Sequence, residues 1–248
     1  MPDRLADKRA LITGASSGIG AATARTFVAE GAKVALVSRR REPLEELAAE
    51  LGDAAVVITA DVGVPDEARA AVAGAIEQLG GLEVAVNSAG VAWPAKLEDI
   101  DDEHWRQVID INLGGTFQIA RAAGLHMKAN GGGAIVNIGS DMSVRAAAMY
   151  SVYCASKAGV LGLTRGLAAE LAPEVTVNAI CPGPIETPML AAEFELFGEG
   201  SRDAAIAEAP LKRLGVPEEV AAGILYLAAD ALWATGTTLE LDGGVTIV

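Results

Sequence analysis

Seven short apolar runs recur along the chain, and longer stretches with helical spacing of apolar residues separate most of them. In chain order the runs are RALIT, KVALVS, AAVVIT, LEVAVN, AIVNIG, VTVNAI and TLELD. Strands that are continuously apolar and alternate with helices are typical of a parallel sheet that is buried on both faces. The pattern therefore predicts a doubly wound α/β fold, with a seven-stranded parallel sheet and helices on both of its faces.

The stretches between the runs end at glycines, as helices commonly do. Residues 19–30 place apolar and small side chains near one helical face before Gly31, and residues 42–51 carry a leucine stripe before Gly52. No repeat of fixed period and no linker interrupts the series. We therefore expect one α/β domain over residues 1–248, a length that such domains commonly reach without splitting into two.

Residues 188–215 depart from this pattern, because they carry two phenylalanines among acidic residues and lie between the last two predicted strands. The segment is either an ordinary helical excursion or a lid over a substrate pocket. We favour the lid, because the motifs described below indicate an enzyme.

The charge of the chain narrows the classes of partner. A formal net charge of −14 disfavours nucleic acid and anionic membranes through long-range repulsion. The first residues are charged, and no uncharged apolar run approaches the roughly 18 residues that a membrane span needs. We expect a cytoplasmic protein with neither a membrane nor a nucleic-acid partner.

The cysteines and histidines do not suggest a metal site. Cys154 and Cys181 have no CxxC or Cys/His neighbour, so they are best interpreted as small buried apolar residues. His104 and His126 are the two histidines, and we expect both on helix surfaces. The sequence predicts no metal, and a histidine-based triad has little support.

A glycine-rich turn, TGASSGIG at residues 13–20, follows the first predicted strand and opens into a helix. This arrangement places backbone N–H groups and the positive end of a helix beside a diphosphate, as in Rossmann-type folds. Gly14 would permit the turn, Gly18 would let the ligand approach, and Gly20 would let helix and strand pack. Because the spacing is not GxGxxG, the turn alone gives only a moderate indication of a dinucleotide site.

The end of the second predicted strand indicates which dinucleotide is bound. An NAD site usually has an acid here for the ribose 2′-hydroxyl, but this chain has Ser38 and Arg39 in the stretch VSRRR. A hydroxyl and a guanidinium suit a 2′-phosphate, so NADP(H) is favoured and NAD(H) is the alternative. Arg40 could serve in place of Arg39, or the arginines could simply be a solvated cap on the next helix.

Taken in order, these motifs resemble the short-chain dehydrogenase/reductase family, in its branch of single-domain enzymes of about 250 residues. The resemblance covers nearly the whole chain and rests on TGASSGIG, Asp61 with Val62, NSAG at 87–90, Asn112, Ser140, YCASK at 153–157, PGPIET at 182–187 and the terminal LDGG. The family usually has NNAG where this chain has NSAG, a change that affects the support of a turn more than the chemistry.

The resemblance, together with the glycine turn and the end of the second strand, gives a predicted cofactor site. Asp61 and Val62 would contact the adenine, and Ile185 and Thr187 the nicotinamide amide. The predicted cofactor-binding residues are Gly14, Ser16, Ser17, Gly18, Ile19, Gly20, Ser38, Arg39, Asp61, Val62, Asn87, Ala89, Gly90, Tyr153, Lys157, Pro182, Gly183, Ile185 and Thr187.

The stretch MYSVYCASKAGV, residues 149–160, raises the question of which tyrosine acts in catalysis. A tyrosine with its ordinary pKa near 10 is a poor base and needs a cation beside it. Residues four apart share a helix face, so Tyr153 lies beside Lys157, whereas Tyr150 lies beside Cys154. Tyr153 is the predicted acid/base, and we expect Lys157 to lower its pKa toward the working pH.

Two more residues complete the predicted catalytic set. Ser140 ends the run AIVNIGS and lies 13 positions before Tyr153, which is the family spacing; it would hold the substrate oxygen, and Ser143 is its rival. By resemblance, Asn112 would hold a water that relays protons from Lys157. The predicted catalytic residues are therefore Asn112, Ser140, Tyr153 and Lys157.

The expected activity is interconversion of a ketone and a secondary alcohol with NADP(H). The predicted pocket wall, mostly apolar, consists of Trp93, Met142, Val144, Tyr150, Pro184, Met189, Leu190, Phe194 and Phe197. Alternatives are a 3-oxoacyl-carrier-protein reductase, a sugar or polyol dehydrogenase, and a non-catalytic sensor of the nicotinamide pool. The resemblance also implies a homotetramer that uses the helices near 105–123 and 153–171 and the C-terminal stretch.

Overall fold

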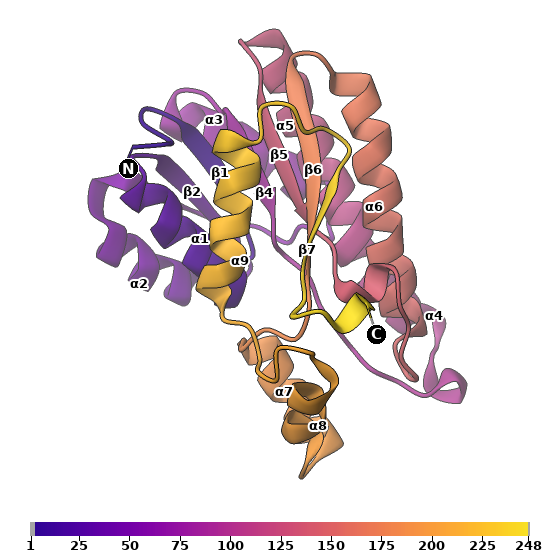
Figure 1. Ribbon diagram of the computed structural model, residues 1–248. Coiled ribbons are helices and arrows are strands. Elements are labelled where there is room, and N and C mark those ends of the chain that lie inside the picture. Colours follow the sequence, from indigo (N-terminus) through magenta and orange to yellow (C-terminus); the bar gives the residue numbers. More distant parts are fainter. Residues whose placement is uncertain (1–2, 248) are drawn as a thin grey trace.

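The computed structural model describes residues 3–247, and a single sheet of seven parallel strands forms its centre (Figure 1). The strands are β1 (Arg9–Thr13), β2 (Lys33–Ser38), β3 (Ala55–Thr59), β4 (Val84–Asn87), β5 (Gly133–Ile138), β6 (Val175–Pro182) and β7 (Thr238–Leu241). Their order across the sheet is β3-β2-β1-β4-β5-β6-β7. The predicted doubly wound, seven-stranded parallel sheet is confirmed.

Helices cover both faces of the sheet. One face packs against α1 (Gly18–Ala29), α2 (Arg41–Leu51) and α9 (Pro217–Leu225), and the other against α3 (Pro65–Leu79), α5 (Thr116–Ala129) and α6 (Ser151–Leu171). Side chains alternate along each strand, so Ala10 and Ile12 of β1 belong to the first layer and Leu11 to the second. The sheet is therefore buried on both faces, which explains its continuously apolar strands.

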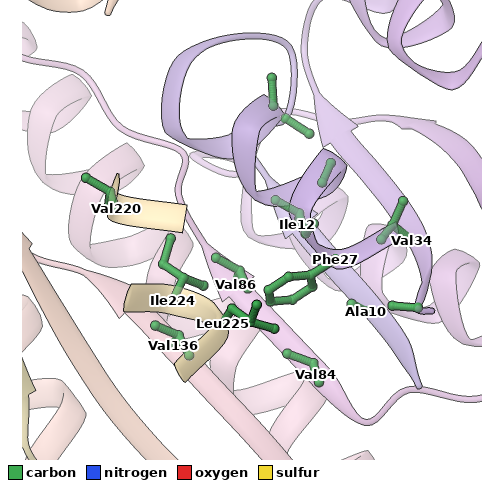
Figure 2. Close-up of a cluster of buried hydrophobic side chains, with 14 of the residues drawn as sticks. Ala10, Ile12, Phe27, Val34, Val84, Val86, Val136, Val220, Ile224 and Leu225 are labelled. Atoms are coloured by element: carbon green, nitrogen blue, oxygen red, sulfur yellow. The ribbon is translucent and has the colours of Figure 1, made fainter. Parts of the chain in front are cut away.

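The first layer holds the largest fully buried side chain of the described residues, Phe27 of α1. Its ring lies between strand residues such as Ile12 and Val34 and the side chains of α9, including Leu225 (Figure 2). Ala residues of α1 that face the sheet let the helix approach closely. Phe27 then fills the space that such small side chains leave between the sheet and the two helices.

The segment after β6 leaves the sheet at its carboxyl edge. It contains α7 (Pro188–Phe197) and α8 (Ser201–Glu208), which lie beyond the sheet in Figure 1. Backbone hydrogen bonds close its base, from Gly215 N to Pro184 O at 3.0 Å and from Glu186 N to Gly215 O at 2.9 Å. No residue of α7 or α8 is fully buried, so these helices are held mainly by contacts at the edge of the molecule.

The connection from β4 to β5 is one helical run with an irregular centre. It passes from α4 (Asp102–Ile109) through a π-helical stretch, Asp110–Gly115, into α5. Three glycines of the neighbouring α6 lie in two environments: a Cβ on Gly159 would lie 2.8 Å from Leu113, whereas Gly162 and Gly166 face open space. Within residues 3–247, no helix is both long and apolar enough to cross a membrane.

Candidate functional site

A cleft of about 790 Å³ follows the carboxyl edge of the sheet from the glycine turn to α7 and α8. The carboxyl ends of parallel strands are where ligands bind in open α/β sheets. Most of the residues predicted from the sequence line this cleft: Gly14, Ser16, Ser17, Gly18, Ile19, Gly20, Ser38, Arg39, Asp61, Val62, Ala89, Gly90, Ser140, Tyr153, Lys157, Pro182, Gly183, Ile185 and Thr187. Of the predicted catalytic and cofactor-binding residues, Asn87 and Asn112 do not line it.

The glycine turn brings the backbone close to its neighbours and leaves the start of α1 without a side-chain cap. Gly14 has φ +67°, and a Cβ there would lie 2.8 Å from the backbone nitrogen of Ala89. Gly18, at φ +52°, begins α1 and faces Thr187 across the cleft. Ser17 is the N-cap of α1, yet no side chain caps this end, and the first turn holds no acid. The first amides of α1 are therefore available to an anion.

Two arginines at the end of β2 flank the turn. Arg39 Nη1 lies 3.7 Å from a carboxylate oxygen of Asp61, and Arg40 Nη2 donates to the hydroxyls of Ser16 and Ser17 at 3.0 and 3.3 Å. Both residues line the cleft, and Arg40 is also the N-cap residue of α2. Arg40, given only as an alternative by the sequence, lies directly over the glycine turn.

Asn87 lies within the sheet behind the cleft. Its amide nitrogen donates to Asn137 Oδ1 of β5 at 2.9 Å, and Asn137 in turn donates to Thr164 of α6. Asn87 thus links β4 to β5 through its Nδ2, its Oδ1 has no hydrogen-bond partner among the described residues, and its predicted contact with the cofactor stays a prediction. The neighbouring turn is held by Thr13, whose hydroxyl accepts from the backbone N–H groups of Ser88 and Ala89; these bonds involve only the backbone of Ser88.

Ser140, Tyr153 and Lys157 come together in the middle of the cleft. Ser140 follows β5, while Tyr153 and Lys157 lie one turn apart on α6. Lys157 Nζ is 5.8 Å from the centre of the Tyr153 ring and donates to the carbonyl of Ile138 at 2.8 Å. The Ser140 hydroxyl donates to Asp141 Oδ1 at 2.8 Å. The site thus combines a phenol, a buried amine and an oriented hydroxyl.

Ser143 and Tyr150, the alternatives to Ser140 and Tyr153 in the sequence, make other contacts. The hydroxyl of Ser143 accepts from Ser140 N and donates to Lys157 O, at 3.1 and 3.0 Å, so it braces the other two residues rather than lining the cleft. The Tyr150 hydroxyl donates to Glu193 of α7. Tyr150 does line the cleft, but its hydroxyl is directed to α7 and no cation lies one turn further along α6.

The expected lowering of the Tyr153 pKa is wrong for the chain by itself. Burial of the phenol raises its pKa, the Ser140 hydroxyl acts in the opposite direction, and the carboxylates of Asp141 and Glu193 raise it further. Helical spacing correctly put Lys157 beside Tyr153, but spacing does not report burial. At neutral pH Tyr153 is protonated and able to donate.

Burial also affects Lys157, whose pKa falls from 10.5 to about 8. Between these pH values the unfolded chain therefore binds a proton at Lys157 that the folded chain does not, so the contribution of Lys157 to stability rises with pH across this window and is lowest below about 8. We expect a gain of roughly 1–3 kcal/mol in the free energy of unfolding. Urea titrations across this pH range should show the gain, and Lys157→Met should remove it; equal slopes in both proteins would contradict this assignment.

Asn112 lies behind the cleft in the π-helical stretch. Its Oδ1 accepts from Val91 N at 2.8 Å, and its Nδ2 donates to Val91 O and to the Ser156 hydroxyl. A Cβ on Gly90 would lie 3.2 Å from Asn112 Oδ1. The amide thus fixes the loop after β4 against α6, and its predicted part in holding a water stays a prediction.

The substrate end of the cleft differs in part from the predicted wall. Met142, Tyr150, Pro184, Met189, Leu190, Phe194 and Phe197 line it as expected. Trp93 and Val144 do not: Trp93 packs edge-on against His104 with ring centres 6.3 Å apart, and Val144 is 60% exposed. The structure adds Asp141, Arg145, Glu193 and Glu208, so this end is more acidic than the sequence suggested.

Comparison with known proteins agrees with this geometry. The family described as enoyl-(acyl carrier protein) reductase matches residues 14–246. The short-chain reductase protein NovJ of Streptomyces niveus is 41% identical over 244 residues, which cover 95% of this chain and 92% of NovJ. The chain belongs to the short-chain dehydrogenase/reductase family. It is therefore an oxidoreductase of a family that uses nicotinamide cofactors.

Other members of the short-chain dehydrogenase/reductase family resemble the chain over its whole length. The 3-oxoacyl-[acyl-carrier-protein] reductase FabG of Thermotoga maritima is 39% identical and covers 98% of this chain and 100% of its own. A solved structure from Brucella melitensis, described as a short-chain dehydrogenase/reductase and glucose/ribitol dehydrogenase, has a TM-score of 0.91 at 35% identity over 99% of both chains. The names of the last two relatives refer to different substrates, so the family alone does not define the substrate of this member.

Of the acidic residues that the sequence analysis missed, Glu193 could have been found from the sequence. Met189, Glu193 and Phe197 recur every four residues, which places them on one face of a helix with the predicted pocket residues. Glu193 therefore shares the pocket face of α7. Asp141 lies in a short 3₁₀ turn and Arg145 on the loop after it, where no such period applies.

Proposed function

We propose that the protein is an NADP(H)-dependent oxidoreductase that interconverts a ketone and a secondary alcohol. The observation that carries this proposal is the convergence of Ser140, Tyr153 and Lys157 in one cleft with an uncapped glycine turn. Binding a nucleotide requires neither a buried phenol nor an oriented serine. A non-catalytic sensor is therefore the weaker alternative.

The roles of the residues follow from their geometry. When bound, the nicotinamide would supply or accept the hydride at the carbon. In the reductive direction, Tyr153 gives its proton to the substrate oxygen, and in oxidation it takes the proton back. To hold that oxygen, the Ser140 hydroxyl would donate to it instead of to Asp141, because a hydroxyl has one proton to donate. Lys157 reaches the carbonyl of Ile138 and lies beside the phenol, where it favours the phenolate that remains after proton transfer.

The preference for NADP(H) rests on the cations at the end of β2. Ser38 holds the backbone of Arg40, with hydrogen bonds of 3.2 and 3.0 Å, and so fixes the two arginines at the rim. A 2′-phosphate placed there would meet Arg39 or Arg40, together with the hydroxyl of Ser38. NAD(H) would lack this interaction but would retain the glycine turn.

Replacing Arg39 by Asp is expected to raise KM for NADPH by about 10- to 100-fold, because a charge-assisted contact to phosphate is lost. KM for NADH should stay within about threefold, since its ribose carries no phosphate there. Arg40→Ala tests the second cation, and Arg41→Ala is the control, because Arg41 pairs with Glu45 on α2 and does not line the cleft. Equal changes for both cofactors would contradict a 2′-phosphate site at Arg39.

The reaction itself is tested by the loss of NADPH absorbance, with NADH in parallel, over aryl and cyclic ketones, sugars and an acetoacetyl thioester. Reduction of ketones with NADPH supports the proposal. Activity confined to the thioester would instead favour a 3-oxoacyl-carrier-protein reductase, and activity confined to sugars a polyol dehydrogenase. Tight NADPH binding without reduction of any carbonyl would favour the sensor.

The names of the relatives support these alternatives to different degrees. FabG and the matched family description both refer to acyl carrier protein, whereas the Brucella structure is described as a glucose/ribitol dehydrogenase. A net charge of −14 is a poor match for an acidic carrier protein. The acidic substrate end described above is the observation that favours a polar alcohol.

The proposal also includes the arrangement of the chain around this site. Residues 1–248 would act as one domain, with 188–215 as the lid, a role supported by the absence of fully buried residues in α7 and α8. Exposed Trp105 and Leu125 on α4 and α5, and Trp233 near the C-terminus, support a homotetramer. A cytoplasmic location is likewise part of the proposal.

A further inference from the structure

Glu193 of α7 is a carboxylate at the substrate end of the cleft that has no cationic partner. Its side chain lines the cleft and is half-buried. Within residues 3–247, Tyr150 is its one hydrogen-bond partner and binds Oε2, and no Lys, Arg or His forms an ion pair with it. Because an ionised carboxylate has about four acceptor positions, most of the hydrogen-bonding capacity of Glu193 remains available to a molecule in the cleft.

The other carboxylates at this end are already paired. Asp141 accepts from the Ser140 hydroxyl and Met142 N through one oxygen, and from Arg145 Nε at 2.7 Å through the other. Glu208 accepts from Arg145 Nη1 at 2.6 Å. A single guanidinium thus serves two acids. Glu193 is the carboxylate whose charge is left uncompensated among the residues that line the substrate end.

Glu193 is also close to the reacting centre. It accepts a hydrogen bond from Tyr150, whose ring centre lies 6.2 Å from that of Tyr153, and its charge contributes to the raised pKa of Tyr153. Burial raises the pKa of the Glu193 carboxyl itself. A partly desolvated acid without a counter-charge gains more from a new hydrogen-bond donor than a solvated acid does.

We propose that Glu193 is a specificity-determining residue and that the substrate carries a hydrogen-bond donor, a hydroxyl or an ammonium group, next to the carbon that reacts. This inference rests on the proposed function, because it assumes that the substrate oxygen lies between Ser140 and Tyr153. A substrate held there would extend past Tyr150 toward α7. An anionic substituent in the same place would be repelled by Glu193.

Four alcohols test this inference, because they share a phenyl ring and a carbinol and differ in one neighbouring group. They are phenylethanolamine, styrene glycol, ethyl phenyl carbinol and mandelate, which carry an ammonium, a hydroxyl, a methyl and a carboxylate group. Their dissociation constants are measured by calorimetry with NADP⁺ bound, and their kcat/KM values by NADPH formation. The variants are Glu193→Gln, Glu193→Leu and the control Glu195→Gln, an exposed acid on the same helix that does not line the cleft.

Wild-type protein should bind phenylethanolamine or styrene glycol at least about 10-fold more tightly than ethyl phenyl carbinol, and it should bind mandelate most weakly. Glu193→Leu should remove the preference, and Glu195→Gln should keep it. Glu193→Gln separates the two donors: it retains an acceptor for a hydroxyl but loses the charge that holds an ammonium. Equal affinities in wild type, or a preference that survives Glu193→Leu, would overturn the inference.

The binding and turnover measurements distinguish the failure of this inference from the failure of the proposed function. Donor-dependent binding that requires Glu193, without NADPH formation from any alcohol, would support the role of Glu193 and count against the proposed reaction. NADPH formation that is equally efficient with all neutral alcohols in every variant would support the reaction and overturn the role of Glu193.

Discussion

Tyr153→Phe is expected to lower kcat by about 10²–10⁴-fold, which is the typical contribution of a positioned general acid or base. The variant loses one oxygen from a half-buried ring beside Lys157, so it should fold normally and retain its cofactor site. Its dissociation constant for NADPH should therefore stay within about threefold of the wild-type value, because no charged contact is removed. Single-turnover reduction of a responsive ketone and NADPH fluorescence titration measure the two quantities.

Tyr150→Phe is the matched comparison, because it removes the same atom from a tyrosine ring 6.2 Å away. The lost hydroxyl bonds Glu193 rather than the substrate oxygen, so kcat should fall by less than about 10-fold, as expected for one neutral hydrogen bond. If the two variants lost activity equally, or if Tyr153→Phe kept most of its turnover, Tyr153 could not be the proton donor.

Phe27→Ala should lower the free energy of unfolding by about 3–5 kcal/mol, because it leaves a cavity in the layer between the sheet, α1 and α9. Phe27 is completely buried in that layer (Figure 2). Urea unfolding at a fixed protein concentration measures the change, since self-association would otherwise alter the apparent stability. Activity at low temperature should be retained, because Phe27 does not line the cleft.

Phe27→Leu is the control, because it keeps most of the apolar volume and should cost only about 1 kcal/mol. An equal loss of unfolding free energy in Phe27→Ala and Phe27→Leu would indicate that the ring does not fill this layer. A cost below about 1 kcal/mol for Phe27→Ala would mean that α1 and α9 can close on the space that the ring vacates.

The fold was largely predictable because its signals are local. The run AAVVIT and β3, Ala55–Thr59, agree to within a residue, since a strand buried on both faces must be apolar throughout. The glycine turn was a weaker signal because its spacing is not GxGxxG, but Gly14 does adopt a positive φ that other residues avoid. The pairing of Tyr153 with Lys157 needed only the helical repeat.

The errors concern properties that depend on residues distant in sequence. Trp93 was placed in the pocket by its position in the chain, but it packs on His104 instead. The raised pKa of Tyr153 is due mainly to burial, which no short motif encodes. The four-residue spacing on α7 could place Glu193 on the pocket face, but its hydrogen bond to Tyr150, 43 positions earlier in the chain, depends on how α7 packs against α6.

The closed base of the segment between Ile185 and Gly215 has a consequence for the evolution of the fold. Its two ends are joined by backbone hydrogen bonds and a parallel bridge, which depend little on which side chains lie between them. The cost of closing a loop also grows slowly with its length, by about 0.6 kcal/mol for each doubling. Insertions, deletions or a transplanted sequence between these ends can therefore be tolerated while the sheet and Tyr153 stay in place. Substrate range and chemistry can diverge separately in such a molecule, because they are encoded by different stretches of the gene.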